Sequence, residues 1–347
     1  MNDFYTKKEI NEYTFEFEIK IAADNFKHSY DLLMQEYAKD SDIKGFRKGK
    51  VPADMINSQV KEMLKFETFE KVAPLYINTA LSKENIEPIA PPEYKEIPKI
   101  LEGLDVTFTI TVTTMPNFKL GDISKIKIDK KKLKVEEKEI EDAIEDLKKT
   151  QETKEKEVND KWAKEIAKVI NAEDVNTLEE LKTKIKEALQ SQKDHYQLHQ
   201  LQDEALRKGI EISNIEIPES AIKFEASERE KAFNQDMQSK GVKIEDFLKA
   251  NNITIEKMRE LWLKDAKDAL EADTFLGLYS KENKIEITDE ELESKIESIK
   301  ASQPNADKNI FSNPQWREYI KNVERKEKGF KQYIESVLGK DFIDVHN

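Results

Sequence analysis

The side chains that could perform chemistry are few and scattered in this chain of 347 residues. Cysteine is absent, which excludes disulfides, zinc–thiolate sites and thiol nucleophiles. The four histidines are His28, His195, His199 and His346. Only His195 and His199 have a spacing that can bind a metal, i and i+4 on one predicted helix. No third ligand is forced onto the same helix face, so we predict no metal site and no other cofactor.

The carboxylates do not define a catalytic pair either. Asp and Glu number 71 against 58 Lys and Arg and are spread along the chain, so no two of them stand out as general acid and base. There is no Ser/His/Asp order and no glycine-rich phosphate loop. The net charge of -13 also argues against a general nucleic-acid binder. The sequence therefore predicts a protein without a catalytic site.

One short stretch, residues 44–52 (Lys-Gly-Phe-Arg-Lys-Gly-Lys-Val-Pro), differs from the rest of the chain in charge. It has basic residues around a single phenylalanine and no acid. Helical patterns flank it, so we expect a loop at the tip of a helical hairpin. Phe46 has little local core to enter there, and an exposed Phe among Arg and Lys is typical of a docking tip for an acidic or polyanionic surface. An ordinary solvated turn is the alternative.

Composition indicates what carries this tip. Charged residues make up 37% of the chain, against about 25% in an average globular protein, which favours long, solvent-exposed helices. The length predicts about two domains. No stretch approaches 18 apolar residues and the N-terminus has no apolar signal core, so we expect a soluble, cytoplasmic protein with no membrane partner.

The first 115 residues contain the patterns of a small α+β domain. Residues 10–23 alternate between apolar and polar, as a half-buried strand does. Asp24 is expected to cap the next helix, and Pro52 to lie in the first turn of the helix after the basic loop. A proline-rich stretch at 85–98 then leads to a second alternating strand that starts at Val106. We expect an antiparallel sheet covered by a helical hairpin over residues 1–115.

Residues 116–160 are expected to form an extended linker and a helix that join or belong to the C-terminal domain. The lysine-rich part, 125–134, could be a second RNA contact, although a solvated sheet edge whose lysines discourage pairing is favoured. A helical pattern begins at Val135 and runs into the charged stretch 148–157, interpreted as a solvated helix end or linker.

Residues 161–347 are expected to form an all-α domain of long amphipathic helices. Thr177 with Glu180 and Thr288 with an acid three positions on are capping-box patterns, and Gly209 fits the end of the first of these helices. Helices of this length reach about 40 Å and enclose little core, which predicts an elongated domain with arms or grooves.

The apolar residues of this half have two interpretations. Most must pack helix against helix, but a minority should line an open cradle for unfolded chains, because Met and aromatic side chains adapt to varied partners. For any single residue, packing is the favoured interpretation. The candidates for substrate binding are Phe233, Met237, Met258, Trp262, Phe275, Trp316, Tyr319 and Phe330.

Residues 45–52 resemble the ribosome-binding signature of the bacterial trigger factor family, in the same place between two helices. The Pro-Pro-Glu-Tyr stretch at 91–94 and the Thr-Leu-Glu-Glu-Leu segment at 177–181 agree with that resemblance. The resemblance implies an ATP-independent chaperone that shields nascent and unfolded polypeptides at the ribosomal tunnel exit. It leaves oligomeric state open, and a homodimer off the ribosome is one candidate.

The resemblance also implies roles within the basic loop. Phe46, Arg47 and Lys48, in the segment that begins at Gly45, would contact a ribosomal protein at the tunnel exit. Lys44 and Lys50 would lie near rRNA phosphates. The cations would add steering and salt dependence to a contact anchored by the phenylalanine.

The chain departs from the family pattern in one respect. Trigger factors usually carry a prolyl-isomerase domain of the FK506-binding type, a glycine-rich and strand-rich module, after the helix that corresponds to 140–153. Between Gly121 and Gly209 this chain has no glycine and no alternating strand pattern after Leu133, so a twisted sheet with tight turns is not expected there. We predict that the isomerase domain is absent.

Two other functions are the alternatives to a ribosome-associated chaperone. One is an active peptidyl-prolyl isomerase, as in full-length relatives, and the other is an extracytoplasmic holdase.

Overall fold

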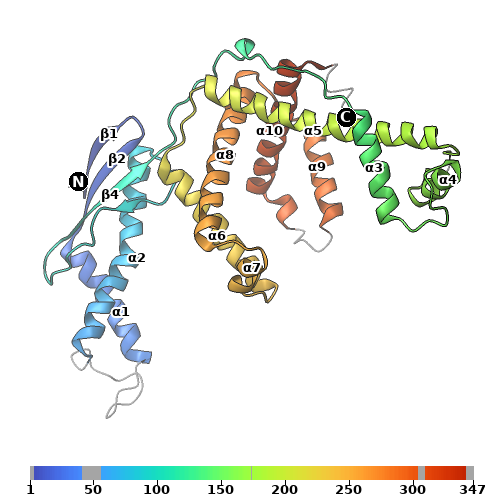
Figure 1. Cartoon of the computed structure of the whole chain (residues 1–347). Helices are drawn as coiled ribbons and strands as arrows, with labels where there is room; N and C mark the ends of the chain where they lie inside the picture. The colour runs from blue at the N-terminus through green and yellow to red at the C-terminus, as the bar shows by residue number, and fades with distance from the viewer. Residues whose placement is uncertain (1–3, 41–55, 173, 304–308, 341–347) are drawn as a thin grey trace. The chain divides into compact units, whose positions relative to one another are not determined.

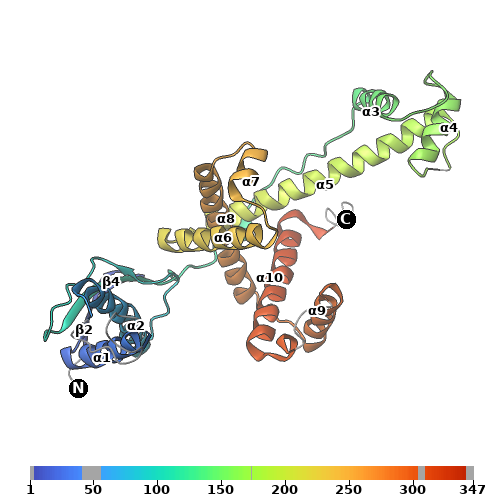
Figure 2. The ribbon, with the colours of Figure 1, turned by 90° about the horizontal axis from the view of Figure 1, so that it is seen from below.

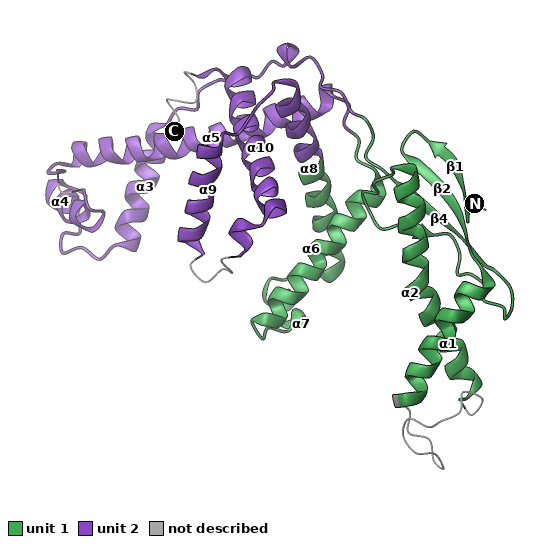
Figure 3. Ribbon diagram, turned by 180° about the vertical axis from the view of Figure 1, so that it is seen from behind, with its two compact units in different colours: residues 1–117, 216–270 green, residues 118–215, 271–347 purple. Residues whose placement is uncertain are grey.

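The computed structural model describes residues 4–40, 56–172, 174–303 and 309–340 (Figure 1). The chain divides into two compact units, residues 1–117 with 216–270 and residues 118–215 with 271–347 (Figure 3). Each unit thus combines segments that are distant in sequence. The boundaries expected from the sequence, at 115 and 160, stay a prediction.

A four-stranded antiparallel sheet forms the N-terminal part of the first unit, in the order β1-β2-β4-β3. The strands are β1 (Tyr5–Asn11), β2 (Thr14–Ile21), β3 (Glu93–Tyr94) and β4 (Val106–Thr113). β2 and β4 are the central pair, with Phe17 opposite Ile110 and Ile19 opposite Phe108. Their alternating apolar residues share one face, as the sequence predicted.

The first strand is where the prediction was incomplete. The strand expected over 10–23 is shorter, because the Asn11 side chain accepts a hydrogen bond from the Tyr13 main-chain N–H in the turn between β1 and β2. β1 itself was not predicted. It lies at a sheet edge and is exposed at every position after Tyr5, so it shows no apolar alternation.

Two helices accompany the sheet, α1 (Ala23–Asp40) and α2 (Ser58–Glu84). Two details of the prediction were wrong. Asp24 lies within the first turn of α1, and Asp105 accepts the hydrogen bond from the Ala23 N–H instead. α2 begins at Ser58 and not near Pro52, because the Asn57 side chain caps it by accepting from the Val60 N–H.

The core of this N-terminal part lies between the sheet and the helices. Its fully buried residues include Phe17, Ile19, Ile21, Ile110 and Val112. They pack with one face of α2, which runs beside the sheet in Figure 1 and contributes Phe69, Ala73, Ile77 and Ala80. Apolar burial on this scale is the main stabilising contribution to the sheet.

The rest of the described chain is almost entirely helical. The helices are α3 (Glu137–Thr150), α4 (Asp160–Val169), α5 (Leu178–Ile212), α6 (Glu219–Ser239), α7 (Ile244–Ala250), α8 (Ile255–Glu282), α9 (Asp289–Ser302) and α10 (Pro314–Leu338), with short 3-10 turns η2 (Ile123–Lys125) and η3 (Ile310–Ser312). The predicted fold class, an α+β N-terminal domain followed by a helical C-terminal region, is confirmed.

Both predicted capping boxes are confirmed, Thr177 with Glu180 on α5 and Thr288 with Glu291 on α9. Gly209, however, does not end α5, which continues to Ile212. A Cβ at this position would lie 2.5 Å from Phe275 Cζ and 2.6 Å from Tyr333 Oη. The glycine is therefore needed for the close approach of two aromatic rings and not for a helix end.

The lysine-rich stretch 125–134 is not a sheet edge. The structure assigns no strand to it, and most of its side chains are exposed. Its main chain is hydrogen-bonded by side chains of α5, among them Gln197 and Lys208. The prediction of solvated lysines was right, but the backbone has a helix as its partner.

Candidate interaction surfaces

The basic segment predicted to dock lies outside the described residues. This covers every residue assigned to it: Lys44, Gly45, Phe46, Arg47, Lys48 and Lys50. In sequence the segment falls between the end of α1 and the start of α2. Its role stays a prediction, while the two helices that carry it can be described.

The α1–α2 hairpin has an apolar cluster of its own next to this segment. Leu33 and Met34 of α1 pack with Leu64 of α2 and with Ile56, which precedes the cap of α2. All four side chains are buried. The cluster is distinct from the sheet core, so the hairpin is held together on both sides of the segment it carries.

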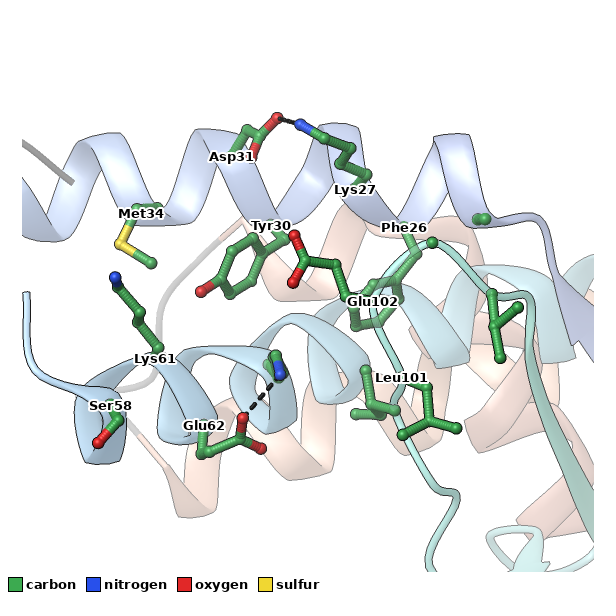
Figure 4. A pocket seen from close by; sticks show the side chains of 15 residues that line it. Phe26, Lys27, Tyr30, Asp31, Met34, Ser58, Lys61, Glu62, Leu101 and Glu102 are labelled. Atoms are coloured by element: carbon green, nitrogen blue, oxygen red, sulfur yellow. Dashed lines mark hydrogen bonds and ion pairs between the residues drawn. The ribbon is translucent and has the colours of Figure 1, made fainter. Parts of the chain in front are cut away.

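A pocket of about 400 Å³ lies between α1, α2 and the loop at 100–104 (Figure 4). Figure 4 shows Phe26, Tyr30 and Met34 directed from α1 toward α2, with Leu101 of the loop nearby. Burial raises the pKa of the Tyr30 phenol, which stays neutral at physiological pH. Apolar side chains such as Phe26, Met34 and Leu101 thus line part of the pocket.

Four of the charged side chains that line this pocket form two ion pairs, each within one helix. Lys27 Nζ lies 2.5 Å from Asp31 Oδ2 on α1, and Lys65 Nζ lies 2.6 Å from Glu62 Oε1 on α2. The hydrogen bond from Lys65 to Glu62 raises the pKa of that lysine. Acids and bases balance, so the pocket does not select for a charged ligand.

A second candidate surface lies on α6, α7 and α8. The rings of Phe233 and Phe247 are 5.2 Å apart between centroids, and those of Phe233 and Trp262 are 5.5 Å apart. All three side chains are only half-buried, and Leu261 and Leu263 beside Trp262 are exposed. Sequence reasoning selected Phe233 and Trp262 but missed Phe247, which is on the short helix α7. We call these three rings the aromatic cluster.

The other predicted substrate residues have different surroundings. Met237 is buried, and Phe275 is fully buried against Tyr279 and Tyr333, so both pack inside the protein in this conformation. Tyr319 is 63% exposed on α10. The half-buried members are Met258, Trp316 and Phe330. The structure thus offers the aromatic cluster and Tyr319 to a partner more readily than the buried pair.

The rings of His195 and His199 on α5 meet edge to face with centroids 4.5 Å apart, and both side chains are exposed. Within the described ranges, no group of three or more His, Asp or Glu side chains has the arrangement of a metal site. The pair by itself leaves most coordination positions to water.

Comparison with known proteins assigns the family. The model for the bacterial trigger factor protein matches residues 4–147, and the model for the trigger factor C-terminus matches residues 177–335. Together they cover well over half of the chain. The chain is a chaperone of the bacterial trigger factor family, as the sequence predicted.

Individual relatives agree at low identity. The trigger factor of Halothermothrix orenii is 24% identical, with 84% of this chain and 89% of the relative covered, and that of Bacillus mycoides is 22% identical, with 81% and 87% covered. A solved structure that concerns promiscuous substrate recognition by the trigger factor chaperone superposes with a TM-score of 0.53 at 20% identity, over 95% of this chain and 99% of that one. The structural likeness supports the fold.

The region between the two family models is short. No prolyl-isomerase model matches between residues 147 and 177. In the structure this region holds the end of α3, all of α4 and the loops beside them, and its described residues contain no strand. The alignment with the Halothermothrix orenii protein spans 388 positions, more than the 347 residues of this chain, so that relative has residues without a counterpart here. The prediction of a trigger factor without the isomerase domain is confirmed.

Across the described helices, none combines the length and the apolar character needed to cross a bilayer.

Proposed function

We propose that this protein is an ATP-independent chaperone of the cytoplasm that docks at the ribosomal tunnel exit and covers apolar segments of nascent chains. The observation that carries the proposal is the sequence Gly-Phe-Arg-Lys-Gly-Lys at 45–50, which falls between the two helices of a hairpin with its own buried cluster. The N-terminal family model covers this whole region.

The charge of the segment supports a specific contact with a polyanionic particle. The protein as a whole carries -13, so nonspecific attraction to RNA is weak, whereas the basic segment is attracted locally. Phe46 would supply an apolar anchor to a ribosomal protein, and the cations would steer docking and respond to salt through nearby rRNA phosphates.

The surfaces proposed for clients are the aromatic cluster and the exposed Tyr319. An aromatic side chain loses little conformational entropy on binding, because only two side-chain torsions define its position. Met258 has an adaptable side chain on the same helix as Trp262. Each contact would be weak, and several together would hold an unfolded chain while allowing its release.

The proposal includes no enzymatic step. Full-length relatives would catalyse prolyl isomerisation with the domain that has no match here. We expect a proline-peptide isomerisation assay to show only the uncatalysed rate, and clear acceleration would overturn this part of the proposal.

Ribosome co-sedimentation tests the docking part. Replacing Phe46, Arg47 and Lys48 together by Ala is expected to abolish pelleting with ribosomes, with an unchanged circular dichroism spectrum. The matched control replaces Lys71, Leu75 and Lys83 by Ala. These residues are exposed on α2, and their replacement removes the same number of cations and apolar groups. The control should pellet like wild type. Equal pelleting of the tip variant would contradict the assignment.

A further inference from the structure

A segment of the chain, residues 127–135, lies along α5 and is here called the strap. It contains no helix, turn or strand, and Figure 1 and Figure 2 both show it running beside α5 toward α3. Both elements belong to the second compact unit. The strap is fastened in an unusual way, because side chains of α5 bind its main chain.

Gln197 binds two main-chain groups of the strap with one amide. Its Nε2 donates to the Lys131 carbonyl at 2.5 Å, and its Oε1 accepts from the Leu133 N–H at 3.2 Å. The side chain is 5% exposed, which makes it one of very few buried polar residues among those described. A buried amide group needs hydrogen-bond partners, and an extended chain supplies both partners of Gln197.

Gln190, two helical turns earlier, repeats the arrangement. Its Nε2 donates to the Leu133 carbonyl at 2.8 Å, and its Oε1 accepts from the Val135 N–H at 3.2 Å. Asp194 accepts a further hydrogen bond from the same Nε2 at 2.8 Å, which orients the amide. Two glutamines thus bind consecutive steps of the strap in the manner of a neighbouring strand.

The bonded groups lie on one edge of the strap. In an extended chain the N–H and C=O of alternate residues point the same way, and residues 131, 133 and 135 supply all four groups that the glutamines bind. The Lys127 carbonyl, on the same edge by this count, accepts from Lys208 Nζ at 2.7 Å. This regular spacing indicates recognition of a strand edge and not an accidental contact.

The dimensions of the two elements agree. From Lys208 to Gln190 the helix rises about 27 Å. From Lys127 to Val135, the partners of these two residues, an extended chain covers about 26 Å, so the two lengths agree. Lys193, between the two glutamines in sequence, donates to the Lys134 carbonyl at 2.9 Å, a group that lies on the opposite edge by the same alternation. The binding row of α5 therefore extends over most of the strap.

Most side chains of the strap contribute little to this contact; the exception is Val135, which is half-buried and packs against the apolar cluster that includes Leu181 and Ile185 of α5. Lys131, Lys132 and Lys134 are exposed, and Leu133 is 43% exposed although it supplies two of the bonded groups. Any residue other than proline has the same main-chain groups. The row on α5 thus recognises a feature that every extended polypeptide presents.

We propose that Gln190, Lys193, Gln197 and Lys208 form a surface that reads the backbone of extended polypeptides, and that the strap occupies it until a client segment takes its place. The inference rests on the proposed chaperone function and names the form in which clients bind. It adds a sequence-independent contact to the apolar surfaces, which fits clients that have little sequence in common.

Amide hydrogen exchange in the full chain tests the competition. The probe is reduced, carboxymethylated α-lactalbumin, which stays unfolded. Adding it is expected to accelerate exchange at the Leu133 and Val135 amides, because the glutamines release them. Exchange at the Ile110 amide, in the sheet of the other unit, serves as the internal control. Unchanged or slower exchange at 133 and 135 while the probe is bound would overturn the proposal.

Affinity for the same probe tests the surface itself. Leu133→Pro with Val135→Pro removes the two N–H groups that bind the glutamines without altering α5, and should tighten probe binding at least about fivefold. Lys132→Pro is the control, since it removes an N–H from the opposite edge, and should bind like wild type. We call the double variant with Leu133→Pro and Val135→Pro the strap-released variant. Adding Gln190→Ala and Gln197→Ala to it should weaken probe binding at least about fivefold.

Gln192→Ala in the strap-released variant controls for a nonspecific effect of changing α5, since Gln192 is exposed on the same helix. Equal affinity in all variants would overturn the backbone-reading surface and leave the chaperone function standing. A wild-type protein that does not bind the probe would overturn the proposed function, and the inference would fall with it. Circular dichroism of every variant distinguishes lost binding from lost folding.

Discussion

The N-terminal sheet and the strap on α5 are held in opposite ways. In the sheet, β2 and β4 turn fully buried side chains such as Phe17 and Ile110 toward α2. In the strap, exposed side chains surround a main chain that polar groups of a helix bind. A buried apolar core is costly to open, whereas single hydrogen bonds contribute only about 1 kcal/mol each and exchange readily. The sheet is therefore suited to support the helical hairpin that carries the docking tip, and the strap is suited to be displaced.

The largest effect is expected in the sheet core. Phe17→Ala should destabilise the sheet by about 3–5 kcal/mol, because it leaves a cavity beside β4 and α2. The matched control, Glu18→Ala, changes the neighbouring exposed residue of β2 and should stay within about 0.5 kcal/mol. All three tryptophans lie outside residues 1–117, so exchange of the β4 amides is the appropriate measurement. Similar effects of the two variants would contradict the account of the core.

A pair of glycines tests whether α5 has an apolar face as well as its polar one. Gly209→Ala would force a methyl group against Phe275 and Tyr333, and we expect a loss of about 1–3 kcal/mol. Gly277→Ala on α8 is the control, since its Cβ would have no atom closer than 4.0 Å outside its own helix. That variant should be stabilised by up to about 1 kcal/mol through helix propensity. Urea unfolding followed by tryptophan fluorescence measures both, and equal stability of the two would refute the close packing.

Tyr333 extends this test to pH. Its hydroxyl donates to the Ala205 carbonyl of α5, and burial raises the pKa of its phenol above the ordinary value. The folded protein therefore keeps a proton that the unfolded chain releases near pH 10. This contribution is complete below about pH 10 and is lost as pH rises above it, by up to about 1.4 kcal/mol per pH unit.

The measurement compares wild type with Tyr333→Phe in urea at pH 8, 10 and 11. The variant lacks the hydroxyl, so it should lose less stability than wild type between pH 10 and 11. The difference isolates Tyr333 from the other tyrosines and lysines that titrate in this range. Parallel curves would mean that Tyr333 ionises as easily in the folded protein as in the unfolded chain.

The smallest effect is expected for the ion pair between α6 and α8. Arg259 donates to Glu230 from both Nε and Nη2, with a shortest distance of 2.7 Å, but its side chain is about half exposed. Arg259→Ala should therefore cost less than about 1 kcal/mol, and most of that loss should vanish in 1 M salt. Thermal unfolding at low and high salt provides the check. A loss of several kcal/mol, or one that salt leaves unchanged, would show that the pair is more important than its exposure indicates.

Much of the fold could be predicted from residue patterns. The alternation around Phe17 and around Phe108 identified the central strands, and Thr177 and Thr288 marked helix starts through local bonds that need no tertiary contact. β1 was missed because an exposed edge strand has no apolar period. Gly209 was misread because the rings that require it, Phe275 and Tyr333, come from helices far away in sequence.

The candidate surfaces were predictable to a smaller extent. The basic segment is local in sequence, so its unusual composition was visible. Phe247 joins the aromatic cluster only through the packing of α7 with α6. Gln190 and Gln197 look like ordinary polar residues of a charged helix, and only their bonds to residues 131–135 distinguish them. A surface that binds the main chain of its partner needs only ordinary polar side chains, so the sequence contains almost no signal for it.

In the proposed function, the basic segment brings client-binding surfaces to nascent chains. The most direct test uses ribosomes stalled with a nascent chain and a photo-crosslinking residue at Leu261, which is 43% exposed beside the aromatic cluster. We expect crosslinks to the nascent chain that disappear when Phe46, Arg47 and Lys48 are replaced by Ala, while binding of free unfolded protein is retained. Equal crosslinking with and without the tip residues, or none from a protein that pellets with ribosomes, would contradict the proposed function.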